Sequence, residues 1–195
     1  MNFWYANPLY VSPWVYVVIV SLVFNYGCWI WGLRRFFRVN AAGMPTRMKV
    51  LQLMASIAMI VNITVVWRAE LSTMCATGGI GLAMVSALLF FSAISANRAR
   101  PLAVAFTEHA PQHLNKNGPY RVIRHPFYTS YTIGWLAGAV AAQSWVLGVI
   151  VVILFYFYRD AASLEEKQFK QSSLAQEHLK YQSETGMFFP RLFKA

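Results

Sequence analysis

Long runs of apolar residues, separated by shorter polar segments, dominate the hydrophobic pattern of the chain. Three such runs occupy residues 13–33, 50–67 and 78–96. Each can cross the roughly 30 Å hydrocarbon core of a bilayer as an α-helix, which rises about 1.5 Å per residue. The runs do not alternate with the short period of half-buried strands. The pattern therefore predicts an all-α integral membrane protein.

A fourth apolar stretch, residues 127–158, is too long for one straight span. Gln143 and Ser144 lie near its middle, which predicts a tight hairpin of two helices that turns at residues 142–145. One long tilted or kinked helix is the alternative. The small-xxx-small spacing of Gly134 and Gly138 is typical of helices whose backbones approach closely. With the hairpin, the chain has about five transmembrane helices.

The polar tail, residues 159–195, differs from the rest in composition. We expect a cytoplasmic helix that continues from the last span, followed by a segment on the membrane interface that contains Phe188 and Phe189.

Composition supports the membrane assignment, since 57% of the 195 residues are hydrophobic and 12% are charged. A soluble domain of this length would carry about 25% charged residues. Aromatic residues make up 16%, and many lie near the ends of the apolar runs, as in the interfacial belt. Cys28 and Cys75 show no metal-ligand spacing, so we expect no metal.

The net charge of +10 raises the question of a nucleic-acid partner. The basic residues of the chain flank the apolar runs and form no aromatic-interleaved face, so we expect no nucleic-acid partner. They concentrate in residues 34–49, 97–125 and 159–195, whereas Arg68 falls on the opposite side. The positive-inside rule then predicts an external N-terminus and a cytoplasmic C-terminus, in a bacterial inner membrane or the endoplasmic reticulum.

Candidate chemistry lies in two polar segments on the predicted cytoplasmic side, residues 112–128 and 159–166. Both adjoin the ends of the hairpin helices, so folding should bring them together at a membrane mouth. Taken one by one, their residues have ordinary explanations: a turn, headgroup anchors, a helix start and a solvated helix face.

Taken together, these residues match a family pattern. The segment GPYRVIRHPFY (118–128), a hairpin, Glu165-Glu166, Tyr181 and then Phe189-Pro190-Arg191 follow in order. They resemble the isoprenylcysteine carboxyl methyltransferase family and the related phospholipid N-methyltransferases, whose pattern reads roughly GxYxxxRHPxYxG, hairpin, EExxL and FGxxYxxY. The resemblance covers about residues 112–191.

The resemblance implies an S-adenosylmethionine-dependent methyltransferase that acts on a lipophilic small molecule or lipid. Residues 1–100 would form three N-terminal spans, and residues 101–195 the cofactor-binding core of one integrated membrane domain. A phospholipid N-methyltransferase is one alternative. A non-catalytic transport or sensor protein is another, although spans nearly free of ionisable residues disfavour a transporter.

The resemblance also implies which residues contact the cofactor. Tyrosine faces suit a sulfonium, a carboxylate can accept from ribose hydroxyls, and Arg or His can donate to the cofactor carboxylate. By position these residues are Gln112, His113, Leu114, Asn115, Tyr120, Arg124, His125, Pro126, Phe127, Tyr128 and Glu165. Glu166 is the alternative to Glu165, because the spacing near Leu174 differs from the family pattern by one residue.

Two further residues are expected to act in catalysis. Glu166 would take the proton that an amine acceptor must lose. Arg159 would orient or neutralise the acceptor, because Ala161 or Ala162 occupies the place of the family's substrate-binding arginine. That departure disfavours a prenylcysteine carboxylate as the acceptor. In a second departure Ser130 replaces the glycine of HPxYxG, from which we expect a looser helix contact.

Overall fold

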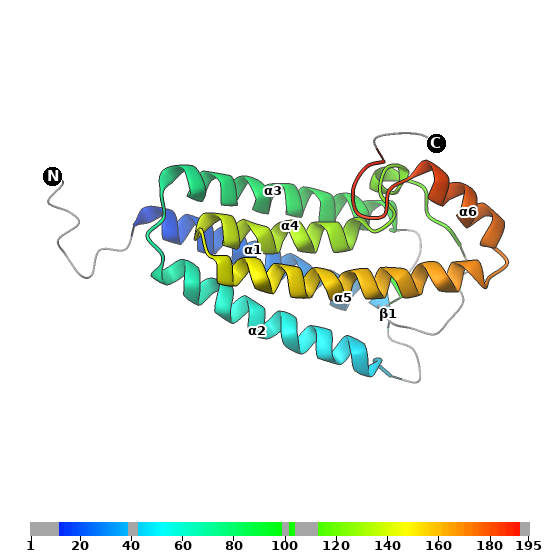
Figure 1. The fold of residues 1–195 in the computed structure, drawn as a ribbon, viewed down its shortest axis with the longest axis horizontal. Coiled ribbons are helices and arrows are strands. Elements are labelled where there is room, and N and C mark those ends of the chain that lie inside the picture. Colours follow the sequence, from blue (N-terminus) through cyan, green and yellow to red (C-terminus); the bar gives the residue numbers. More distant parts are fainter. Residues whose placement is uncertain (1–11, 39–42, 99–101, 104–112, 192–195) are drawn as a thin grey trace, which may run out of the picture.

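A computed structural model describes residues 12–38, 43–98, 102–103 and 113–191. Five long helices lie side by side in a bundle (Figure 1). They are α1 (Pro13–Phe36), α2 (Thr46–Arg68), α3 (Thr73–Ala96), α4 (Pro126–Ala141) and α5 (Trp145–Lys170). The shorter elements are the 3-10 helix η2 (Gly118–Arg121), α6 (Ala175–Glu184), and two-residue strands β1 (Phe37–Arg38) and β2 (Leu102–Ala103), which pair in parallel. The predicted all-α class is confirmed.

Four of these helices, α1, α2, α3 and α5, are long and apolar enough to cross a membrane. α4 has 16 residues and extends about 24 Å. The predicted hairpin is confirmed, because α4 ends at Ala141 and α5 begins at Trp145, which excludes one continuous helix. Gln143 adopts a positive φ of 49° in the turn, and the Ser144 side chain caps α5 by accepting from the Leu147 amide.

Glycines set how closely the helices pack. A Cβ on Gly79 of α3 would lie 2.7 Å from the Ala137 carbonyl oxygen of α4, so here two backbones meet. The predicted pair on α4 has a different role. Gly134 accommodates the Trp29 ring of α1, and Gly138 accommodates the Asn62 amide of α2. Both glycines therefore make room for side chains of neighbouring helices.

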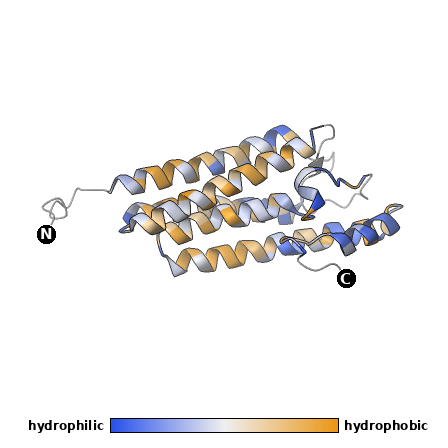
Figure 2. Cartoon of the chain, turned by 90° about the horizontal axis from the view of Figure 1, so that it is seen from above, coloured by the Kyte–Doolittle hydropathy of each residue, from blue (hydrophilic) through white to orange (hydrophobic). Residues whose placement is uncertain are grey.

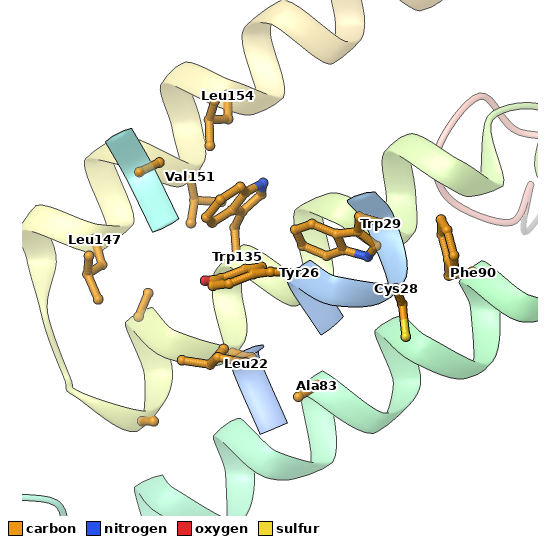
Figure 3. Packing of buried hydrophobic residues seen from close by; sticks show 14 of the residues in the cluster. Leu22, Tyr26, Cys28, Trp29, Ala83, Phe90, Trp135, Leu147, Val151 and Leu154 are labelled. Atoms are coloured by element: carbon orange, nitrogen blue, oxygen red, sulfur yellow. The ribbon is translucent and has the colours of Figure 1, made fainter. Parts of the chain in front are cut away.

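Large side chains from four helices fill the space between them (Figure 3). Tyr26 and Trp29 of α1 pack on Trp135 of α4, with ring centroids 5.1 and 5.4 Å from it. The Trp135 indole donates a 3.0 Å hydrogen bond to the Tyr158 hydroxyl of α5. This buried bond satisfies a polar group that no water would reach in a bilayer.

The expectation of a looser contact at Ser130 is wrong. Ser130 and Ser86 of α3 are fully buried, and each hydroxyl donates to the other residue's carbonyl oxygen at 2.9 Å. The two hydroxyls thus join α3 to α4 at a buried, close contact.

Polar residues gather at the end of the bundle that carries η2 and α6 (Figure 2). α5 continues past its apolar part, which ends near Tyr158, as far as Lys170. The predicted helical continuation of the last span is therefore confirmed. A turn then separates α5 from α6 and brings the following chain back towards the start of α4.

Candidate functional site

The entry to α4 is fixed by the tail of the chain. The amides of Arg124 and His125 donate to the carbonyl oxygens of Gly186 and Met187, at 2.8 and 3.1 Å. This pairing fixes the backbone of the two residues until Pro126 begins the helix, where a missing N–H has no cost. The Arg124 and His125 side chains are consequently presented together at the mouth of the bundle.

Glu165 and Glu166 lie opposite them on α5. Neighbouring helical residues point about 100° apart, so the two carboxylates reach different partners. The Tyr128 hydroxyl donates to Glu165 Oε1 at 2.5 Å, and Arg124 Nε donates to Glu166 Oε1 at 2.7 Å. Arg124, His125, Tyr128, Glu165 and Glu166 together form what we call the carboxylate cluster.

His125 lies between the two carboxylates. Its Nδ1 is 3.6 Å from Glu165 Oε2, and its Nε2 is 3.3 Å from Glu166 Oε1. Its ring stacks on Tyr128, which in turn stacks on Tyr158 of α5. The imidazole is thus held in its plane by aromatic rings and at its edges by oxygen atoms.

The two carboxylates differ in how they are used. Both oxygens of Glu166 accept hydrogen bonds, since Gln182 Nε2 donates to Oε2 at 2.5 Å, and the side chain is only 12% exposed. Glu165 is 37% exposed. Glu165 is therefore the carboxylate that a ligand can reach, whereas Glu166 is enclosed by protein.

A second group of predicted residues lies next to η2. Asn97 Nδ2 donates to the Tyr120 hydroxyl at 2.9 Å, and Asn115 Nδ2 donates to Asn97 Oδ1 at 2.9 Å. The Tyr181 hydroxyl donates to the Tyr120 carbonyl oxygen at 2.6 Å. Burial raises the pKa of Tyr120 well above its usual value and that of Tyr181 to about 12. Both phenols are therefore neutral at physiological pH.

The remaining predicted residues lie apart from the cluster or at its edge. His113 and Leu114 are half-buried in the segment before η2, and Gln112 lies outside the described residues. The Phe127 ring packs into the core, 5.4 Å from Phe37 and 5.6 Å from Phe90 between centroids. Pro126 is fully buried.

Arg159 is exposed on α5, and within the described part of the chain its side chain has no hydrogen bond or ion pair. It lies seven positions before Glu166, which places both on one helix face about two turns apart. Among the described residues no group of three or more His, Cys, Asp or Glu could hold a metal ion.

The comparison with protein families covers the same elements. Residues 71–177 match the family model described as phospholipid methyltransferase. The chain belongs to the phospholipid methyltransferase family. The match spans just over half of the chain, from the start of α3 into α6, and includes the whole carboxylate cluster. A comparison with curated proteins finds no significant match.

Membership of the phospholipid methyltransferase family confirms the predicted relationship. Together with the apolar helices, it identifies the chain as an integral membrane protein of a methyltransferase family. The matched region ends before Gln182 and Thr185, although both contact the cluster.

Sequence reasoning missed these tail residues. Arg124 Nη1 donates to the carbonyl oxygens of Thr185 and Gln182, so the guanidinium joins the tail to α5 through Glu166. The interfacial position expected for Phe188 is wrong, because its ring is buried against His125 and Phe155. Contacts to backbone carbonyl oxygens cannot be predicted from residue types, because every residue has a carbonyl. The apolar Phe188, which follows a polar helix, could have indicated that the tail packs against the bundle.

Proposed function

We propose that this protein transfers a methyl group from S-adenosylmethionine to a lipophilic acceptor at the mouth of α4 and α5. One observation carries the proposal: His125, Tyr128 and the accessible Glu165 meet where the apolar bundle ends, within the region that matches the family. In this proposal residues 101–195 form the cofactor-binding core, and α1–α3 form its scaffold.

The residues of the carboxylate cluster fit this cofactor by their chemistry. When bound, S-adenosylmethionine supplies a methyl group activated by a sulfonium. The Glu165 carboxylate can accept hydrogen bonds from ribose hydroxyls or an ammonium. The negative charge of the accessible Glu165 carboxylate also suits a cation.

Positions at the cluster suggest separate roles for the charged residues. Because Glu166 is saturated by Arg124, His125 and Gln182, we assign it to positioning the imidazole. An amine acceptor must lose a proton, and we move this role from Glu166, the residue expected from the sequence, to the more exposed Glu165. A carboxylate or thiolate acceptor needs no base, and a dry mouth favours its methylation because charge is lost.

Two acceptor classes have support from specific observations. The family match and the alanines at 161 and 162 favour the amine of a phospholipid. The exposed Arg159 guanidinium, on the face of Glu166, favours a lipophilic carboxylate instead. We place the mouth on the cytoplasmic side, where the basic loops predict it and where a soluble cofactor can enter.

Calorimetry with S-adenosylhomocysteine tests the cofactor site. Removing the carboxylate in Glu165→Gln should weaken binding about 10- to 100-fold, since a hydrogen bond to a charged group contributes about 1.5–3 kcal/mol. Glu177→Gln is the matched control, because it makes the same change at the surface ion pair with Lys116. Equal affinities in both variants, or no binding by the native protein, would contradict the proposal.

The acceptor is then identified from its product. The purified protein is incubated with methyl-labelled S-adenosylmethionine and a native lipid extract, and labelled lipids are analysed by mass spectrometry. A labelled amine headgroup supports the first class and a labelled ester the second. A protein that binds the cofactor but labels no lipid would contradict a lipid acceptor.

A further inference from the structure

A groove separates the first turn of α2 from the polar extension of α5. Its volume is about 700 Å³. The lining residues are Pro45, Thr46, Arg47, Leu164, Lys167, Gln168 and Gln171. In Figure 1, α2 inclines away from α5 towards residue 46. The groove lies on the side of α5 that faces α2. Glu165 of α5 instead contacts Tyr128 of α4, so the groove is separate from the carboxylate cluster.

Charge in this groove has one sign. Arg47 and Lys167 are cationic, the two glutamines supply neutral amides, and no carboxylate lines the groove among the residues that the structure describes. Arg47 also pairs with Asp160 of α5 at 3.2 Å. Within the described residues, Lys167 has no ion pair. A ligand with an anionic, hydrogen-bond-accepting group would complement this lining.

Depth in the membrane narrows the class of ligand. The Arg47–Asp160 pair lies next to the end of the apolar part of α5, near Tyr158. Residues Leu164 to Gln171 lie between about 9 and 20 Å beyond Tyr158 at 1.5 Å per residue. Arg47, paired with Asp160 two residues beyond Tyr158, thus places its end of the groove at the level of the lipid headgroups, and the end at Lys167 and Gln171 extends towards the aqueous side. Exposed apolar side chains continue from it along α2, at Leu53, Ile57 and Ile60.

We propose that this groove binds the phosphate of an anionic lipid headgroup, with the acyl chains along α2. Lys167 and Arg47 would contact the phosphate, and Gln168 or Gln171 would donate to its oxygens or to the glycerol. The proposal is independent of the methyl-transfer reaction, because it rests on no residue of the carboxylate cluster.

The test titrates short-chain phosphatidylglycerol into the full chain in neutral detergent micelles, with native mass spectrometry to count bound lipid. A basic side chain near an anionic headgroup contributes about 1 kcal/mol, so Lys167→Gln should raise the Kd about fivefold. Lys170→Gln is the matched control, because it removes the same charge from the same helix outside the groove. Its Kd should equal that of the native protein.

Two results would overturn the proposal. An equal rise in Kd for both variants would show general attraction of lipid to a basic surface. Displacement of the lipid by inorganic phosphate at the lipid's own concentration would show a site for soluble phosphate. A rise in the Kd for phosphatidylglycerol in Lys167→Gln but not in Lys170→Gln, with the weaker binding of zwitterionic phosphatidylcholine changed less, would support the headgroup assignment.

Discussion

Tyr128 and Glu165 are 37 residues apart in sequence, yet the tyrosine hydroxyl donates to the carboxylate at 2.5 Å. The bond crosses from α4 to α5 at the mouth of the bundle. It fixes one oxygen of the most accessible acidic side chain of the cluster and leaves the other facing His125 at 3.6 Å.

Removing that hydroxyl should impair the reaction and leave the fold intact. Tyr128→Phe keeps the ring stack on His125 and Tyr158 but frees Glu165 to rotate. We expect turnover to fall about tenfold, since a hydrogen bond to a charged group is worth roughly 1.5–3 kcal/mol. Methyl transfer from labelled cofactor measures it. Tyr131→Phe is the control, because the Tyr131 hydroxyl has no hydrogen-bond partner among the described residues. Equal losses of turnover in the two variants would argue against a role for the Tyr128–Glu165 bond.

Arg124 should prove the main attachment of the tail. Arg124→Gln leaves Glu166 without its closest cation and frees the carbonyl oxygens of Gln182 and Thr185. Breaking a buried ion pair costs about 3–5 kcal/mol, and this pair is nearly buried. Hydrogen exchange should therefore accelerate across residues 182–188. The double variant Arg124→Gln/Glu166→Gln should be less destabilised than the sum of the single variants; strict additivity would mean that the two residues do not act as a pair.

Gly138 should not tolerate a methyl group. A Cβ there would lie 2.0 Å from Asn62 Oδ1, so Gly138→Ala forces α2 outward and should destabilise by about 1–3 kcal/mol. Gly148→Ala in α5 is the control, because nothing lies within 4 Å of its Cβ position and alanine favours a helix by about 1 kcal/mol. Thermal unfolding in detergent compares them. An equal fall in Tm for both variants would contradict a special role for Gly138 in the contact with Asn62.

Arg159 distinguishes a membrane anchor from an acceptor contact. As an anchor it should accept Arg159→Lys with little change, since both side chains reach the interface. As a contact to an acceptor carboxylate it needs the bidentate guanidinium, so turnover at saturating acceptor should fall on the order of 10²-fold in both Lys and Ala variants. Cofactor affinity and Tm should stay unchanged in either case. Near-normal turnover of the Lys variant would leave Arg159 as an anchor.

The predicted orientation places the N-terminus outside and α6 in the cytoplasm. The reason is the concentration of Lys and Arg between the first and second spans, between the third and fourth, and after the fifth. Reporter fusions after residues 1 and 195 should report opposite compartments. Both reporters on one side would mean an even number of spans.

The helices were predictable from the sequence because apolar runs in lipid have few alternatives to a helix. The hairpin turn was predicted at residues 142–145, and α4 and α5 are separated there. Helix ends were less accurate. α2 begins at Thr46 rather than residue 50, because its first turn contains Arg47 and Lys49 and so lies outside the apolar run that marked the span.

The candidate site was predictable in its residue types and less so in its contacts. Arg124, His125, Tyr128 and both glutamates do come together. Which glutamate is enclosed depends on Gln182, and Gln182 reaches Glu166 only because the tail folds back on Ile123 and His125. Such long-range pairing has no local signature in the chain.

The pairing of Ile123 with Gly186 also sets an order of events during synthesis. The segment that contains Gln182 and Thr185 leaves the ribosome after all five long helices have been made. Until then the Arg124 and Glu166 side chains lack their partners in the tail. The amides of Arg124 and His125 likewise lack the carbonyl oxygens of Gly186 and Met187. A nascent chain already inserted in the bilayer therefore has its spans before it has a finished site, and the mouth of the bundle closes last.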